Sequence, residues 1–341
     1  MGSSSHPPAA VHLLPVAAAA LLLAAALLPT VVGWWGRQAD LSVLGWVASL
    51  LSSLRPQLVV VSAVAAVMFL AAWGPVPALL AGVASAVAAV PVLSAAVGPA
   101  SPQKLPDSPG GSLVVRFHNL NDNNPDVAAA VRSAVSASDG EEPHLVAFFE
   151  TPLSSREAFE AVEAELRPGW RRLYGEFRPS GAGMVLYSRL PVVSAEHLEL
   201  PSGRPAAQAV VELEGGPIRL LFAHPVSPRS LSLHVSQAED LSYLAGLLEV
   251  SPLPAVLFGD LNVTTHSSLW VPFRTRGLVS AVSSSTWSYL PGTPLESLVS
   301  LGIDHVVFDP DRVAVSSPRL GGWAGSDHRP VSVEVAPMSA R

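Results

Sequence analysis

The sequence contains no cysteine and a single lysine, Lys104. The absence of cysteine excludes disulfide bonds, a thiolate nucleophile and cysteine-ligated zinc, and it is compatible with either side of a membrane. The near absence of lysine argues against a polyanionic partner, because sequence-independent DNA binding draws its affinity from Lys and Arg contacts to phosphates. We therefore do not expect nucleic acid as a partner.

Charge of either sign is nearly absent from the first hundred residues, which contain only Arg37, Asp40 and Arg55. The rest of the chain contains 18 basic and 26 acidic side chains, a net charge of −8. Hydrophobic residues make up 49% of the sequence, and this excess is concentrated in the uncharged part. The composition predicts a membrane region followed by a soluble, acidic region.

The uncharged region predicts a transmembrane domain at residues 1–100. Three segments, at about 11–33, 57–73 and 77–97, approach or exceed the roughly 20 apolar residues that a bilayer-spanning helix needs. The apolar segment 41–54 is short for a span and predicts an interfacial or re-entrant helix. The start of the chain lacks the Lys and Arg of a cleaved signal peptide, so we expect the first span to be retained.

A Pro-, Gly- and Ser-rich stretch at 101–112 predicts a linker. The following region, 113–338, alternates short β runs with helical stretches, which predicts one α/β domain. A helix is expected at 123–137, with Asn124 as its cap and Pro125 in its first position. Another is expected at 231–248. The expected strands are LVVRF (113–117), HLVAFF (144–149), GMVLYS (183–188), AVVELE (209–214), IRLLFAH (218–224), AVLFGD (255–260), DHVVF (304–308) and VSVEV (331–335).

Polar residues recur where these apolar runs begin or end, and strand ends in one sheet converge on one rim. They are Asn119, Glu150, His224, Asp260, Asn262, Asp304, Asp327 and His328. Carboxylate and amide oxygens suit Mg²⁺ or Mn²⁺. A metal, a water-activating carboxylate and histidine donors together form a set suited to phosphoryl transfer. Each residue alone also has an ordinary structural explanation, such as a turn or a solvated histidine.

The motifs FHNLN, LVAFFE, MVLYSRLPV, LLFAHP, LFGDLNVT, STW, GIDHVVF and GSDHRPV resemble, in this order, those of the endonuclease/exonuclease/phosphatase superfamily. That group includes DNase I-like nucleases, sphingomyelinases and inositol-phosphate phosphatases. The resemblance covers roughly 112–336. It implies an α/β fold, specifically a four-layer sandwich of two packed, mostly antiparallel sheets with outer helices.

The resemblance also implies a metal site that holds Mg²⁺ or Mn²⁺. Glu150 resembles the principal metal ligand and Asp327 a further carboxylate of the metal site. Asn119 resembles the amide beside them, although Asn121 and Asn123 are alternatives in the same motif.

The remaining residues resemble the groups that act on the phosphate and the water. Asp260 resembles the carboxylate that orients and deprotonates the attacking water, and Asn262 the amide that holds the phosphate or the metal. His328 and His224 resemble the two phosphate-contacting imidazoles. Asp304 resembles the carboxylate that fixes the tautomer and orientation of His328. The implied reaction is in-line attack of water on a P–O bond without a covalent enzyme intermediate.

Membrane spans joined to this domain by a short linker raise the local concentration of a lipid-borne phosphate. The arrangement resembles the actinomycete membrane phosphatases linked to teicoplanin resistance (VanJ-like proteins), and the Ala/Val/Arg-rich composition fits an actinobacterial origin. That resemblance implies an extracytoplasmic domain that hydrolyses an undecaprenyl-type pyrophosphate in glycopeptide resistance. The positive-inside rule, applied to Arg37 and Arg55, gives the opposite side. We adopt the extracytoplasmic placement from the resemblance.

Two alternatives remain open. One is a phosphodiesterase that acts on phospholipid head groups or on nucleic acid. The other is a non-catalytic, membrane-anchored binding protein that retains the fold without its activity.

Overall fold

The computed structural model describes residues 9–34, 42–97, 105, 111–136, 142–166, 169–179 and 181–338. The chain divides into two compact units. One comprises Met1–Gly98 and Thr265–Leu269, and the other comprises Pro99–Thr264 and Trp270–Arg341. The predicted linker at 101–112 lies almost entirely outside the described residues.

The first unit is helical. Its helices are α1 (Ala9–Trp34), α3 (Val43–Ser53), α4 (Arg55–Trp73) and α5 (Pro75–Val97). Among the described residues, α1, α4 and α5 are long and apolar enough to cross a membrane, which confirms the three predicted candidate spans. The predicted short segment is α3, whose first turn is capped by the Ser42 hydroxyl, which accepts a hydrogen bond from the Gly45 amide at 3.1 Å.

Small residues let the long helices pack closely. Ala26 of α1 and Ala84 and Ala88 of α5 form a buried cluster. The Ser85 hydroxyl donates a hydrogen bond to the Val59 carbonyl of α4 at 3.0 Å. Such close contacts and interhelical hydrogen bonds replace the hydrophobic effect as the force that joins helices within lipid.

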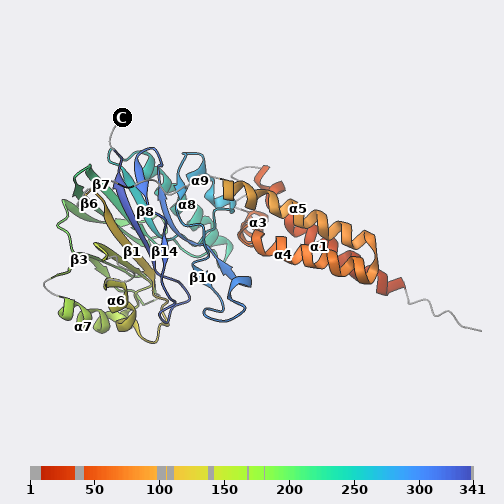
Figure 1. Ribbon diagram of the computed structural model, residues 1–341, viewed down its shortest axis with the longest axis horizontal. Coiled ribbons are helices and arrows are strands. Elements are labelled where there is room, and N and C mark those ends of the chain that lie inside the picture. The colour runs from red at the N-terminus through yellow and green to blue at the C-terminus, as the bar shows by residue number, and fades with distance from the viewer. Residues whose placement is uncertain are drawn as a thin grey trace, which may run out of the picture. The chain divides into compact units, whose positions relative to one another are not determined.

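The second unit contains two large sheets (Figure 1). The first sheet has the order β13-β15-β1-β2-β4-β3, with β14 also paired to β15. Its strands are β1 (Leu113–Asn119), β2 (Leu145–Phe149), β3 (Arg171–Glu176), β4 (Met184–Ser188), β13 (Val313–Val315), β14 (Arg319–Leu320) and β15 (Val331–Pro337). All its pairs are antiparallel except β1 with β2.

The second sheet has the order β5-β6-β7-β8-β12-β9, with β7 and β8 as its parallel pair. Its strands are β5 (Ser194–Glu199), β6 (Pro205–Leu213), β7 (Gly216–Ala223), β8 (Ala255–Asp260), β9 (Val279–Ser280) and β12 (Asp304–Phe308). A separate small ribbon pairs β10 (Trp287–Ser288) with β11 (Ser300–Leu301). The helices of this unit are α6 (Val127–Val135), α7 (Arg156–Leu166), α8 (Leu231–Glu249) and α9 (Val271–Arg274).

The core forms where the inner faces of the two sheets meet. Alternate β1 residues point inward, and Phe117 packs edge-on against Phe258 of β8 at a centroid distance of 6.2 Å. The intervening residues of the first sheet face outward, where Phe148 packs against Phe159 of α7 at 5.4 Å. Helix α8 packs on β8 of the second sheet. The period-2 alternation of a strand therefore produces the predicted sandwich with outer helices.

One local prediction is wrong. The cap of α6 is Asp126, whose carboxylate accepts a hydrogen bond from the Ala129 amide at 2.9 Å, so the helix begins at Val127. The Asn124 side chain instead donates to the carbonyls of Leu120 and Ala324, at 3.0 and 3.2 Å. An Asn engaged with two other segments is not available to cap the helix, and the next acidic residue takes that position.

Phe258→Ala should destabilise the protein by about 3–5 kcal/mol, because Phe258 is completely buried between the sheets and its loss leaves a cavity. Thermal unfolding of the detergent-solubilised full chain measures this loss. The matched control is Tyr289→Ala, since Tyr289 is 73% exposed and its truncation should change stability by less than about 0.5 kcal/mol. Equal losses for the two variants would contradict the assignment of this core.

Candidate active site

The parallel strand pairs bring four predicted residues to one rim. Asn119 and Asp260 are the last residues of β1 and β8, and Glu150 and His224 directly follow β2 and β7. Because β1 is parallel to β2 and β7 to β8, the strands of each pair end at the same edge. Hydrogen bonds between the ends of β1 and β8 show that the edges of the two sheets meet.

Two antiparallel strands add their first residues, or the residues just before them, to the same rim. Asp304 opens β12 and lies directly opposite Asp260 in the register with β8. Asp327 and His328 precede β15, which pairs with β1. The predicted site residues are thus brought together from the ends of six strands.

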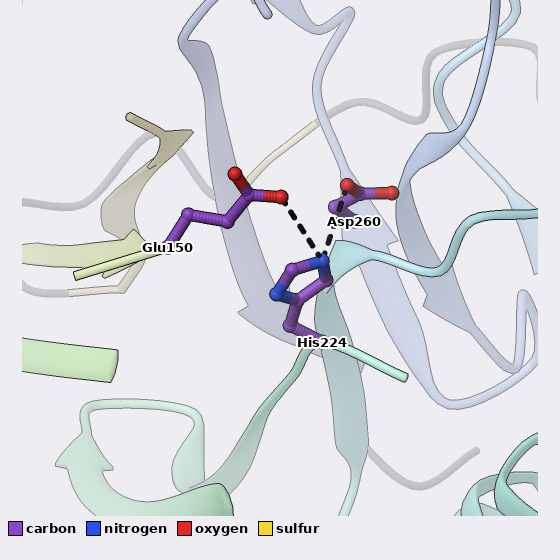
Figure 2. Close-up of side chains that lie close together, drawn as sticks. All are labelled: Glu150, His224 and Asp260. Carbon is purple, nitrogen blue, oxygen red and sulfur yellow. Dashed lines mark ion pairs between the residues drawn. The ribbon is translucent and has the colours of Figure 1, made fainter. Parts of the chain in front are cut away.

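The carboxylate of Asp260 is the centre of the site. It accepts a hydrogen bond from Asn119 Nδ2 at 2.9 Å, and the same amide donates to Glu150 Oε1 at 3.1 Å. His224 Nε2 lies 3.5 Å from Asp260 Oδ2 and 3.7 Å from Glu150 Oε1 (Figure 2). Asp260 is only 1% exposed, so its charge depends on these neighbours rather than on water.

His328 approaches Asp260 from the other sheet. Its Nε2 lies 3.5 Å from Asp260 Oδ2, and its Nδ1 lies 2.8 Å from Asp304 Oδ2. This is the pairing of His328 with Asp304 that the sequence predicted. The Ser326 hydroxyl accepts from the His328 amide at 2.9 Å and donates to the Asn119 carbonyl at 2.7 Å, so the loop before β15 is tied to the end of β1.

The buried charges shift the pKa values of both partners. Burial alone would lower the pKa of His328, but the charges of Asp304 and Asp260 raise it to about 10. Burial alone would raise the pKa of Asp260, but the charge of His328 and the interactions with His224 and the Asn262 amide hold it well below its ordinary value. At neutral pH the imidazolium and the carboxylate coexist.

Asp327 lies beside this cluster but is engaged by neutral donors. Its two oxygens accept from Asn121 Nδ2 and Trp287 Nε1, both at 2.8 Å. The Asn121 amide N–H in turn donates to Asn119 Oδ1 at 3.0 Å. Asn121 therefore connects Asp327 to Asn119, and the predicted role of Asp327 as a metal ligand stays a prediction.

Asn262 is held by its surroundings. Its amide N–H donates to Asp260 Oδ1 at 2.8 Å and its Nδ2 donates to the Pro225 carbonyl at 3.1 Å. Asn262 and Glu150 both adopt positive φ, 53° and 54°, a conformation that non-glycine residues adopt mainly where the surrounding structure enforces it. The backbone is thus set to present these two polar residues at the rim.

Two groups of side chains within the described residues could hold a metal ion: Glu150 with His224 and Asp260, and Asp260 with Asp304 and His328. The first group has one carboxylate that is partly accessible and borders the Asn119 amide. Its oxygen-rich donors suit a hard divalent cation. In the second group His328 is already paired with Asp304, so Glu150 of the first group is the better-placed ligand.

The comparisons with known proteins concern the family and the fold. The sequence model of the Endonuclease/Exonuclease/phosphatase family matches residues 115–328, most of the two-sheet unit. The chain belongs to this family. Its members are phosphoester hydrolases, both phosphatases and phosphodiesterases, that typically depend on a divalent metal. A comparison with curated proteins gave no match.

Solved structures share the fold. An endonuclease/exonuclease/phosphatase from Beutenbergia cavernae is 20% identical, with a TM-score of 0.51 and coverage of 66% of this chain and 72% of the other. TDP2 of D. rerio, complexed with a single-strand DNA product, is 14% identical, with a TM-score of 0.52 over 66% and 98% of the two chains. A family protein from Bacteroides vulgatus is 16% identical, with a TM-score of 0.50 over 67% and 99%. At these low sequence identities the similarity establishes a shared fold and nothing more.

Sequence reasoning assigned no role to several residues that shape the site. Trp287 belongs to the quoted motif STW, but only the structure shows that it binds Asp327. Thr286 accepts a hydrogen bond from the Asp304 amide at 3.1 Å, and Ser326 ties its loop to the end of β1. The short polar motifs around the acidic residues could have indicated these hydrogen-bonding partners, since buried carboxylates need donors.

Asp304→Asn should lower the pKa of His328, because the substitution removes a buried negative charge that stabilises the imidazolium. The protonated form would then be lost at lower pH, and the alkaline limb of the pH–rate profile should move to lower pH. We expect activity at neutral pH to fall about 10- to 100-fold, as for other supports of a catalytic histidine.

NMR titration of labelled His328 and phosphate release against pH measure the two effects. Asp311→Asn, on an exposed turn, is the control and should match the wild type. An unchanged His328 titration in Asp304→Asn would refute the electrostatic coupling.

Proposed function

We propose that the protein is a membrane-anchored, Mg²⁺- or Mn²⁺-dependent phosphohydrolase that uses water to release phosphate from a lipid-linked pyrophosphate. An undecaprenyl-type pyrophosphate of the cell envelope is the proposed substrate. The observation that carries the proposal is the convergence of an amide and two imidazoles on the buried carboxylate of Asp260, within a fold whose family hydrolyses phosphoesters.

Each residue has a defined task in this reaction. Glu150, with Asn119 and Asp327, is proposed to hold the cation, which would neutralise phosphate oxygens and the leaving group when bound. Asp260 is ionised at neutral pH, so it orients a water molecule and takes its proton as the new P–O bond forms.

The two histidines act on the phosphate. The His328 imidazolium, fixed by Asp304, donates to a phosphoryl oxygen and stabilises the charge that develops in the transition state. His224 Nε2 lies 3.5 Å from the same oxygen of Asp260 that His328 approaches, and contacts a second phosphoryl oxygen. Asn262, anchored on the Pro225 carbonyl, keeps the loop after β8 in place beside them. The water oxygen bonds to phosphorus as the bond to the leaving oxygen breaks.

Two features support a lipid-borne substrate. Only 15 residues separate the end of α5 at Val97 from the start of β1 at Leu113, and so short a tether to a membrane helix would raise the local concentration of a lipid-borne substrate. The acidic balance of the domain disfavours long polyanions. The resemblance to VanJ-like phosphatases supports an extracytoplasmic placement and a role in glycopeptide resistance.

Asp260→Asn should reduce phosphate release from undecaprenyl pyrophosphate by about 10²- to 10⁴-fold, because the amide cannot accept the proton of the attacking water. Phosphate release is measured with the full chain in detergent, with Mg²⁺ or Mn²⁺ and with a chelator. Asp311→Asn serves as the control. Retained activity in Asp260→Asn, or activity that survives complete metal removal, would contradict the mechanism.

The products separate the proposed phosphatase from a phosphodiesterase. A panel of undecaprenyl pyrophosphate, sphingomyelin, phosphatidylinositol phosphates and DNA should yield inorganic phosphate and undecaprenyl phosphate from the first substrate. A phosphomonoester or diacylglycerol as the main product would instead establish a diesterase. No hydrolysis of any substrate, together with no metal binding, would favour a binding protein.

The extracytoplasmic placement predicts that protease added to intact cells digests the two-sheet domain. The expected result is loss of a C-terminal tag without lysis, while a cytoplasmic control protein stays intact. Protection of the tag until the cells are lysed would place the domain in the cytoplasm.

A further inference from the structure

Arg204 interacts electrostatically with two other arginines, and we call the three the arginine cluster: Arg178, Arg204 and Arg229. The charge of Arg204 also interacts with those of Glu150 and Asp260. Each arginine lies in a different connection. Arg178 follows β3, Arg204 directly precedes β6, and Arg229 lies between β7 and α8. No motif of the sequence predicted them as a group.

Backbone pairing places two of them at the rim. Arg178 forms a parallel bridge with Pro152, two residues after Glu150, and its guanidinium donates to the Gly203 carbonyl at 2.7 Å. It therefore ties the segment after Glu150 to the turn that carries Arg204. Strand β6 pairs with β7 so that Ala206 lies opposite Ala223, which puts Arg204 beside the residues that follow β7. Those residues begin with His224.

The charges of this cluster and of the catalytic acids interact. Arg204 is half-buried, which lowers its pKa, whereas the charges of Glu150 and Asp260 raise it and those of Arg178 and Arg229 lower it. Arg178 has a counter-charge, because it forms an ion pair with Glu176. Within the described part of the chain, the side chains of Arg204 and Arg229 form no hydrogen bond or ion pair.

The Arg204 guanidinium, with its donors open, thus lies beside the residues that follow β7, and Arg229, whose donors are also open, belongs to the same connection as His224. A partly buried cation without hydrogen-bond partners is costly, and guanidinium donors match the oxygens of a phosphate. We propose that the arginine cluster binds a second phosphate group of the substrate, joined to the phosphate that is attacked at Asp260. The site then selects pyrophosphates over phosphomonoesters. This inference rests on the proposed function.

The chemistry assigns each phosphate a place. Water attacks the terminal phosphorus, and the bond from that phosphorus to the bridging oxygen breaks. The electron pair stays on the bridging oxygen, so inorganic phosphate and a lipid monophosphate are the products. The leaving monophosphate gains negative charge in the transition state, and Arg204 and Arg229 stabilise that charge where it develops.

A purely structural role for Arg204 makes a different prediction. Arg204 also stabilises the ionised form of Asp240, a buried acid of α8. If this counter-charge were its whole task, its replacement would lower stability or lower all activities to the same extent. Binding of a second phosphate instead requires a loss that depends on the number of phosphates in the substrate.

The test compares farnesyl pyrophosphate with farnesyl monophosphate, which share one chain and differ by one phosphate. kcat and KM are measured for the full chain and for Arg229→Gln, Arg204→Gln and the control Arg276→Gln. Arg229 is exposed, so its variant should fold even if Arg204→Gln does not. Arg276 pairs with Glu249, away from the site.

We expect kcat/KM for the pyrophosphate to fall about tenfold or more in each cluster variant. The loss for the monophosphate should be less than about threefold.

Equal losses for the two substrates would overturn the inference and leave the proposed phosphatase intact. If the wild type hydrolyses neither substrate, the proposed function fails instead, and calorimetry still tests the cluster. Inorganic pyrophosphate should then bind more tightly than inorganic phosphate in the presence of Mg²⁺, and Arg229→Gln should remove the difference. Equal affinities of the wild type for the two anions would overturn the inference.

Discussion

The buried carboxylate of Asp260 is the constraint on which the site depends. A carboxylate that is removed from water costs several kcal/mol unless partners compensate for the lost hydration. Asn119 and His328 belong to the first sheet or its connections, whereas His224 comes from the second sheet, to which Asp260 itself belongs. Asp260 is therefore satisfied only when the two sheets are packed in the correct register. The stability of the sandwich and the geometry of the site are aspects of one arrangement.

The two sheets reach this arrangement in the same way. Each contains one parallel pair, β1 with β2 and β7 with β8, flanked by an antiparallel strand that starts at the rim. In the first sheet this strand is β15 and in the second it is β12. Parallel neighbours supply residues from their carboxyl ends, and the antiparallel neighbour supplies residues from its amino end. Residues separated by up to 209 positions, from Asn119 to His328, converge without long loops.

The sequence allowed the central strands to be predicted, because their continuous β-branched and aromatic runs are buried on both faces. The edge strands β3 and β5 were not predicted. RRLYGE and SAEHLE carry charges and lie partly in solvent, so hydrogen bonds to one neighbour, rather than an apolar pattern, make them strands. The carboxylates and imidazoles of the site were predictable, since they end or begin apolar runs. Arg204 was not, because its importance depends on the pairing of β6 with β7.

The charge balance of the site links the binding of cation and substrate. Glu150, Asp260, Asp304 and Asp327 lie at one rim, and the His328 imidazolium offsets only one negative charge there. Such a centre repels a phosphate until a divalent cation is bound. Apart from the His328 imidazolium, the positive charge nearest to these acids is that of the arginine cluster, whose Arg204 interacts with Glu150 and Asp260. In the proposed reaction a phosphate at the centre would require the cation, whereas a second phosphate beside it would have protein donors of its own. This division would let one rim combine an acidic, cation-binding centre with affinity for a doubly phosphorylated anion.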